Sequence, residues 1–266
     1  MKDYKGNYIT INCWNQYFSH VVKMILEHYD TKEYSNAVFI LGSYIFHDLD
    51  FFKDRYEGKK IIIYQMEQLF LAHNEPHWVD VTKVVKRLKK ISKSKGDEIW
   101  EMCSINSAFL KQYDITPNKL VPLRYTKSLE ELDHNVEPEI DLFFYGNLNE
   151  RRSKVLARLA YLFYFEDVSI AWVAGMDFDL QKKYIEKSKI ILNLHHTETF
   201  NRQEQPRIFY ALINKKCILS EPSQKNYFKK AIIETEDFSS SVKKLLKNDS
   251  YRKQGEKGYE IFKKLY

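Results

Sequence analysis

The stretch IDLFFYGNLNERR at residues 140–152 joins a short apolar run, a glycine and the polar start of a helix. Residues 140–145 have the length and apolar content of a buried strand, and residues 150–164 carry apolar side chains at helical spacing. The glycine between them, Gly146, lets the chain turn sharply and lets a ligand approach the backbone. We therefore predict a strand, a turn and a helix here, the unit from which parallel α/β sheets are built.

The same alternation continues to the end of the chain. Short apolar runs and helix-length amphipathic segments follow one another after residue 164. The predicted strands are at 168–173, 190–194, 216–219 and 231–234, and the predicted helices are at 179–187, 205–214, 238–247 and 250–265.

The residues before the polar stretch 126–139 show the same alternation of predicted strands and helices. Asn12 or Asn15 is expected to cap its first helix, and Ser104 its last. The predicted strands are at 8–14, 36–41, 60–66, 98–103 and 119–122, and the predicted helices are at 17–29, 79–91 and 104–113.

Two runs of strands separated by helix-length segments predict an α/β protein with two Rossmann-like domains. Their sheets should be parallel, because a parallel connection needs a crossover of a dozen or more residues. We predict an N-terminal domain at 1–130, a C-terminal domain at 139–248 and a C-terminal helix at 249–266. The two parallel sheets are expected to face a central cleft, since ligands of such domains lie beyond the carboxyl ends of the strands.

The composition excludes several classes of protein. Only 8 of the 266 residues are glycine, no two of them form G-x-G, and the P-loop pattern is absent. Cys13, Cys103 and Cys217 are far apart, so a disulfide framework or a thiolate zinc site is not expected. The N-terminus leads into no run of signal-peptide length and no apolar segment is long enough to span a bilayer, so we expect a cytoplasmic protein.

The net charge of +6 is modest, and lysines are concentrated at 83–95 and near the C-terminus. These lysines are interpreted as solvated helical faces. The alternatives are a weak contact with an anionic membrane surface or with a polyanion. We do not expect binding of a specific nucleic acid, because lysine runs alone carry no sequence preference.

The turn at 146–152 is the first candidate for a ligand site. A helix N-terminus offers free N–H groups, and an arginine can bind a phosphate through two parallel hydrogen bonds. Gly146, Asn147, Arg151 and Arg152 are therefore candidates for an anion site. The alternative is an ordinary turn with solvent-exposed arginines.

The polar segment 195–207 follows a predicted buried strand and precedes a predicted helix. His195 and His196 lack the H-E-x-x-H spacing of a zinc site, so hydrogen bonds to a sugar or a phosphate are expected instead of metal binding. The alternative is a polar connecting loop. The other candidates here are Glu198, Glu204, Gln205 and Arg207.

In the first domain, Glu67 follows the strand predicted at 60–66 and could act as a general base on an acceptor hydroxyl. The alternative is a carboxylate at the start of a helix. Gly42 and Ser43 follow the preceding strand, and His47 and Asp48 are weaker candidates on the same rim.

These segments together resemble glycosyltransferases of the GT-B fold, in particular a family of small bacterial and viral members. The resemblance rests on an ordered set of motifs between residues 60 and 222. They are YQMEQL at 64–69, DEIWE at 97–101 followed by Asn106, VPLRY at 121–125, FYG at 144–146 followed by Arg151 and Arg152, NLH at 193–195, EQPRIFYAL at 204–212 and SE at 220–221.

The resemblance implies transfer of a sugar from a nucleoside diphosphate donor to a glycan or glycolipid acceptor, without a metal or other cofactor. The second domain would bind the nucleotide sugar, with its diphosphate near Gly146, Arg151 and Arg207. Arg207 would be catalytic, because it would neutralise the departing diphosphate. The first domain would bind the acceptor near Asn15, Gly42, Ser43 and Glu67, with Glu67 as the catalytic base.

One position departs from the family pattern. Tyr210 stands where retaining relatives have a carboxylate that contacts the donor ribose. Tyr210 is therefore placed in the donor site, while an inverting or a retaining mechanism remains open. A non-catalytic nucleotide- or glycan-binding module on the same scaffold, and an adaptor for polyanions or membrane surfaces, are the alternative functions.

Overall fold

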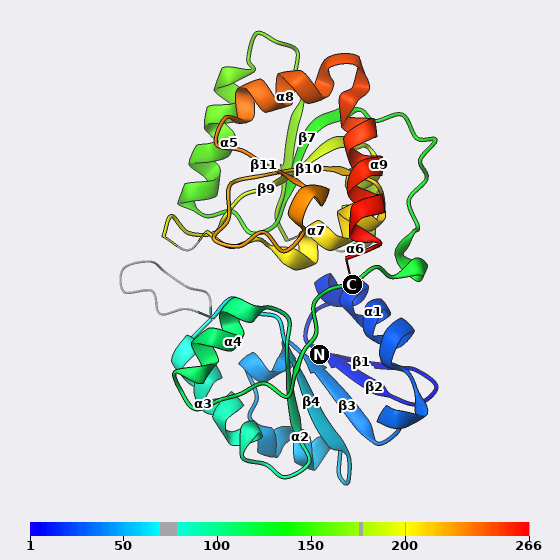
Figure 1. The fold of residues 1–266 in the computed structure, drawn as a ribbon, viewed down its shortest axis with the longest axis vertical. Coiled ribbons are helices and arrows are strands. Elements are labelled where there is room, and N and C mark those ends of the chain that lie inside the picture. The colour runs from blue at the N-terminus through cyan, green and yellow to red at the C-terminus, as the bar shows by residue number, and fades with distance from the viewer. Residues whose placement is uncertain (70–78, 176–177, 200, 266) are drawn as a thin grey trace. The chain divides into compact units, whose positions relative to one another are not determined.

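The computed structural model describes residues 1–69, 79–175, 178–199 and 201–265 (Figure 1). The chain divides into two compact units, Met1–Leu123 and Arg124–Tyr266, and each unit contains one sheet. The boundary lies just before the polar stretch 126–139, which belongs to the second unit rather than joining the two.

Asn214 explains why this stretch packs on the second unit. Its side-chain oxygen accepts hydrogen bonds from the N–H groups of Glu131 and Leu132, at 3.0 and 3.1 Å. Its amide nitrogen donates to the carbonyl of Leu129 at 2.9 Å. The buried Asn214 side chain thus bonds three backbone groups of this stretch, which in a helix or strand would bond to other backbone groups.

The first unit contains a six-stranded sheet in the order β1-β2-β3-β4-β5-β6. The described pairs from β2 to β6 are parallel, as predicted, but β1 pairs antiparallel with β2. The sequence did not indicate β1, because its residues KDYK are polar and the strand lies at the sheet edge. The strands are β1 (Lys2–Lys5), β2 (Thr10–Cys13), β3 (Ala37–Leu41), β4 (Lys60–Gln65), β5 (Glu98–Glu101) and β6 (Lys119–Leu120).

Helices α1 (Ser19–Tyr29), α2 (Leu49–Arg55), α3 (Val81–Ser92) and α4 (Ser104–Lys111) belong to the first unit. Helix α2 was not predicted, and its N-cap is Asp48, whose carboxylate accepts from Phe51 N at 3.2 Å. The candidate at Asp48 is therefore a cap and not part of a ligand rim. Short 3₁₀ turns lie at Gln16–Phe18, Lys32–Tyr34 and Ser43–Ile45.

The two caps predicted from the sequence are both wrong. Cys103 caps α4 in place of Ser104, with its sulfur accepting from Asn106 N at 3.5 Å. Asn12 lies inside β2 and donates to Asp3 at 2.7 Å, while α1 has no side-chain cap. The 3₁₀ turn before α1 moves its first residue beyond the reach of either asparagine.

The second unit contains a five-stranded sheet in the order β11-β10-β9-β7-β8, and all its pairs are parallel. Each strand was predicted to within about two residues. The strands are β7 (Ile140–Tyr145), β8 (Ile170–Val173), β9 (Ser188–Asn193), β10 (Cys217–Ser220) and β11 (Ile233–Glu234).

Helices cover both faces of this sheet (Figure 1). Phe144 points into a core shared with α5 and α8, whereas its neighbour Phe143 stacks on Tyr184 of α6, with ring centres 5.5 Å apart. Alternate residues of β7 therefore face α5 on one side and α6 on the other. The helices are α5 (Glu150–Leu162), α6 (Phe178–Glu186), α7 (Gln205–Ile213), α8 (Phe238–Leu246) and α9 (Ser250–Phe262).

The C-terminal helix α9 belongs to the second unit. Gly255 and Gly258 lie against the carbonyl oxygens of Lys215 and Ala231, where a side chain would overlap the backbone. In the described part of the chain, no helix has both the length and the hydropathy needed to cross a bilayer.

Candidate functional site

The guanidinium group of Arg207 lies directly over Gly146, which follows β7. Arg207 comes from the first turn of α7, and its guanidinium carbon lies 4.9 Å from the ring centre of Phe144 and 5.5 Å from that of Tyr145. A Cβ atom on residue 146 would overlap Nη2 of Arg207, and the φ angle of Gly146 is +137°. Glycine is thus required here both for backbone geometry and for the space that Arg207 occupies.

The charge of Arg207 is incompletely compensated. Its Nη1 atom is buried and has no hydrogen-bond partner among the described residues. Burial, followed by repulsion from Arg152, lowers the pKa of Arg207 to about 10, although Glu204 acts in the opposite direction. A desolvated guanidinium with a spare donor is a strong site for an anion.

Arg152 has a different role from the one predicted. It is 2% exposed, and it donates to the carbonyl of Leu194 from Nε and Nη2 at 3.1 and 2.9 Å. It also donates to Asn147 O at 2.9 Å and to Glu204 Oε1 at 2.8 Å. Since these donors are used within the protein, Arg152 fixes the loops of the site instead of presenting a free fork to a ligand.

Glu204 completes this charge cluster. Burial would raise the pKa of Glu204, but the charges of Arg152 and Arg207 outweigh it and lower the pKa. One carboxylate therefore faces two guanidinium groups, and the cluster carries an excess positive charge next to Gly146. An added anion would balance it.

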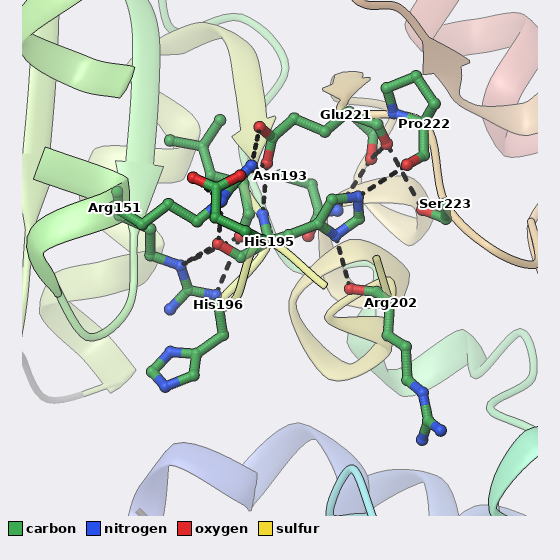
Figure 2. Close-up of polar contacts among 12 residues, drawn as sticks. Arg151, Asn193, His195, His196, Arg202, Glu221, Pro222 and Ser223 are labelled. Atoms are coloured by element: carbon green, nitrogen blue, oxygen red, sulfur yellow. Dashed lines mark hydrogen bonds and ion pairs between the residues drawn. The ribbon is translucent and has the colours of Figure 1, made fainter. Parts of the chain in front are cut away.

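A second cluster centres on Glu221, which follows β10 (Figure 2). Its two carboxylate oxygens accept from Arg151, at 2.6 Å from Nη2 and 3.0 Å from Nη1, and Oε2 also accepts from the backbone N–H of His195 at 2.6 Å. Arg151 further donates to His195 O at 3.0 Å and pairs with Glu198 at 3.2 Å. Glu221 was not among the predicted site residues, although it ends a motif of the resemblance.

The His195 ring lies between two backbone carbonyl groups, as Figure 2 shows. Nδ1 is 2.8 Å from Arg202 O, Nε2 is 3.0 Å from Pro222 O, and the residue is 1% exposed. Both ring nitrogens thus contact the protein, and neither is directed at a ligand. His195 joins the segment before α7 to the turn after β10, which differs from the hydrogen bond to a donor that the sequence suggested.

A cavity of about 520 Å³ adjoins this second cluster. Apolar side chains of α5 and the first residue of α8 form part of its wall, and carboxylates, arginines, His195 and other polar residues form much of the rest. Its lining includes Arg151, Val155, Leu159, Glu198, Glu221 and Phe238. Apolar walls with a few convergent polar groups are typical of small-molecule sites.

Three other residues predicted for the donor site, Tyr210, Gln205 and Asn147, are not among the residues that line this cavity. The side chain of Tyr210 is buried in the core against Phe178, with ring centres 5.1 Å apart, and burial and nearby Glu131 raise its pKa. Tyr210 therefore packs within the unit instead of lining the cavity. Gln205 is buried at the start of α7, and Asn147 is exposed.

His196 contacts the loop that begins α5. Asn149 donates to His196 O at 2.6 Å, and its own side-chain oxygen caps α5 by accepting from Arg152 N at 2.9 Å. Residue 200, within the same predicted segment, lies outside the described residues.

The acceptor-side candidates follow three neighbouring parallel strands of the first unit. Asn15 follows β2, Gly42 and Ser43 follow β3, and Glu67 follows β4, so all lie at one edge of that sheet. Gly42 has φ +74°, and the buried Ser43 Oγ has no hydrogen-bond partner among the described residues. Glu67 is 8% exposed.

The described ranges contain no group of three or more His, Cys, Asp or Glu residues that could hold a metal ion. No protein-family model matches the sequence, and no curated protein matches it.

Solved structures do resemble the chain. The TarM protein of S. aureus, in complex with UDP, superposes with a TM-score of 0.56 and 10% identity over 85% of this chain and 52% of TarM. Sucrose-phosphate synthase of Thermosynechococcus elongatus superposes with a TM-score of 0.55 and 10% identity over 87% of this chain and 69% of the synthase. The T4 phage protein BGT, in complex with its UDP-glucose substrate, superposes with a TM-score of 0.51 and 11% identity over 97% of this chain and 92% of BGT.

The chain thus spans about half the length of TarM and nearly all of BGT. These proteins are GT-B glycosyltransferases with two Rossmann-like domains. The likeness confirms the predicted fold class, since the present chain also contains two parallel-stranded α/β units.

Proposed function

We propose that this chain is a glycosyltransferase that moves a sugar from a nucleoside diphosphate donor to a glycan or glycolipid acceptor, without a metal. The proposal rests chiefly on Arg207, a half-buried side chain whose buried Nη1 atom has no hydrogen-bond partner among the described residues and whose guanidinium lies over Gly146, at the end of a Rossmann-like strand. Such a group suits the diphosphate that leaves during transfer.

The chemistry requires that the negative charge of the departing diphosphate be neutralised. In a metal-independent enzyme, cationic side chains and backbone N–H groups do this. Arg207 supplies the cation, and the turn from Gly146 to the N-terminus of α5 supplies the N–H groups and the favourable end of the helix dipole. Glu204 attracts Arg207 electrostatically, and Arg152 holds the Glu204 carboxylate through a hydrogen bond.

The nucleoside half of the donor would occupy the cavity beside Arg151. Its volume of about 520 Å³ is sufficient for a nucleoside. Glu198 and Glu221 line it and could accept hydrogen bonds from ribose hydroxyl groups, a contact that the buried Tyr210 does not make. UDP and UDP-glucose in the TarM and BGT structures favour a uridine nucleotide.

The first unit would bind the acceptor through Asn15, Gly42 and Ser43. Glu67 would remove the proton from the attacking hydroxyl, which corresponds to an inverting displacement. If Glu67 is not the base, a retaining route with attack on the same face of the sugar remains.

The proposal is tested by calorimetric titration of UDP, GDP and ADP into wild type and Arg207→Ala. We expect the variant to bind its nucleotide more weakly by about 1.5–3 kcal/mol, the range for hydrogen bonds to charged groups. Lys154→Ala is the matched control, because Lys154 is an exposed cation on α5 that pairs only with Glu150 in the described contacts. Equal affinity in wild type and Arg207→Ala would contradict the donor site.

Consumption of the corresponding nucleotide sugars then separates the enzyme from the alternative. Nucleotide binding without turnover of any UDP-, GDP- or ADP-sugar would support a non-catalytic binding module, the function that the missing carboxylate at Tyr210 favours.

A further inference from the structure

The backbone of Glu67 is held by two buried amide side chains. Gln65 donates to Glu67 O at 2.8 Å and accepts from Glu67 N at 2.9 Å, so it binds both polar groups of that residue. Asn106 donates to Glu67 O at 2.6 Å and accepts from Leu69 N at 3.0 Å. The position of Glu67 therefore depends on which way these two amides face.

The carboxyl group of Glu101, at the end of β5, sets that orientation. Oε1 accepts from Cys103 N at 3.0 Å and from Asn106 Nδ2 at 3.1 Å, and Oε2 accepts from Gln65 Nε2 at 3.3 Å. An ionised carboxylate only accepts hydrogen bonds, so it directs the NH₂ side of both amides toward itself. The oxygen sides are then left for the N–H groups of Glu67 and Leu69.

Protonation of Glu101 would weaken one of these links. Because Oε1 already accepts two N–H groups, a proton would reside on Oε2 and oppose the NH₂ group of Gln65. Gln65 could then reverse its amide, which would break both of its bonds to Glu67. The link from Oε1 to Asn106 would remain.

The surroundings make this protonation accessible near neutral pH. Burial raises the pKa of Glu101 to about 8, against the hydrogen bonds from Cys103, Asn106 and Gln65 that lower it. Among the described titratable groups, the Tyr44 phenol interacts with the charge of Glu101 and also with that of Glu67. Tyr44 donates to Gln65 Oε1, and burial and the charges of Glu67 and Glu101 raise its pKa well above the usual value.

On the basis of the proposed function, we propose that Glu101 is a positioning residue for acceptor activation: when ionised, it locks Gln65 in the orientation that, together with Asn106, holds Glu67 at the end of β4. Glu101 itself does not touch a reacting group. It acts through the amides, and its proton sets how firmly Glu67 is placed.

The positioning is tested without reference to activity. In ¹⁵N-labelled wild type, the backbone amide resonance of Glu67 should shift with pH with a midpoint near 8. In Glu101→Gln, which presents NH₂ in place of Oε2 and resembles the protonated form, that shift should be absent. Glu98→Gln is the matched control, because Glu98 lies on the same strand but pairs with Lys60 and Trp100. An unchanged titration in Glu101→Gln would overturn the proposal.

A second readout connects the network to turnover. If only the ionised form positions Glu67, kcat of wild type should rise about tenfold between roughly pH 7 and 9, as expected for one group with a pKa of about 8. Glu101→Gln should lack this rise, match wild type at low pH and retain the KM for the donor. A purely structural role would lower its kcat equally at every pH, which would contradict the proposal.

The two proposals fail in different ways. Absence of sugar transfer in wild type would refute the proposed function, while the Glu67 resonance still decides whether Glu101 controls the position of Glu67. If Glu101→Gln does not fold, Gln65→Met removes the hydrogen bond between Gln65 and Glu101 while keeping a side chain of similar length. Its Glu67 resonance should also lose the titration, and a retained titration would refute the role of the Gln65 link.

Discussion

Gly146 and Arg207 share one space: a methyl group on residue 146 would overlap Nη2 of Arg207. In the donor site proposed above, the glycine after β7 and the arginine in the first turn of α7 therefore depend on each other for space. Sequence separation hides this relationship, because sixty residues and two strands lie between them. Substitution of either residue should therefore weaken nucleotide binding.

We expect Gly146→Ala to weaken nucleotide binding almost as much as Arg207→Ala, by about 1.5–3 kcal/mol, because the added methyl displaces the guanidinium. The double variant should be little worse than either single variant, since each removes the same contact. Calorimetric titration of the three proteins measures this.

The control is Gly175→Ala. Gly175 also has a positive φ angle, +69°, but apart from its chain neighbours no described atom lies within 4 Å of its added Cβ. It therefore places an alanine at a positive φ angle without touching Arg207. Equal losses of affinity in Gly146→Ala and Gly175→Ala would attribute the effect to strain and contradict the shared site.

Arg152 and Arg207 should differ in what they stabilise. Arg152→Met leaves Glu204 and the carbonyl of Leu194 without their partner, so the free energy of unfolding should fall by about 3–5 kcal/mol. Arg207→Met removes a desolvated charge whose Nη1 has no hydrogen-bond partner among the described residues, so the change in the free energy of unfolding should stay within about 1 kcal/mol. Urea denaturation of the two variants gives both values, and a larger loss in Arg207→Met would reverse the assignment of roles.

His195 should matter for the stability of the second unit more than for ligand contact. His195→Ala removes the ring between Arg202 O and Pro222 O, so we expect a loss of about 1–3 kcal/mol in the free energy of unfolding. Nucleotide affinity, measured on the folded variant, should fall less than in Arg207→Ala. A stable His195→Ala protein that no longer binds nucleotide would instead make the ring a ligand group.

The alternation of strands and helices could be predicted because apolar runs of strand length mark it directly. The exceptions have physical reasons: β1 is a polar edge strand, and α2 is a seven-residue helix whose main signal is the Asp48 cap. Short polar elements depend on tertiary contacts that hydrophobic periodicity does not record.

The candidate site could be predicted less completely. The sequence placed Gly146 at a strand end and Arg207 near the start of a helix, and the fold brings them together. It could not tell that Arg152 and His195 use their donors on backbone carbonyls, because that depends on the three-dimensional course of the loops. Glu101 was part of a motif, but its role depends on amides contributed by β4 and α4.

Lys216 should make stability depend on pH in the alkaline range. Its amine donates to Glu186 O at 2.7 Å and to Ser188 O at 3.1 Å, and burial lowers its pKa from 10.5 to about 8. Between these values the unfolded chain holds a proton that the folded chain has released, so this group makes the free energy of unfolding rise with pH. Below about pH 8 both states carry the proton and the contribution is constant.

Lys216→Met lacks this titrating amine, so its free energy of unfolding should rise less with pH than that of wild type in the alkaline range. Urea denaturation of both proteins between roughly pH 8 and 10 compares the slopes directly. Lys215→Met is the control, because Lys215 pairs with Glu256 at the surface and shares the charge change. The burial of the Lys216 amine would be contradicted if the two variants had the same slope as wild type.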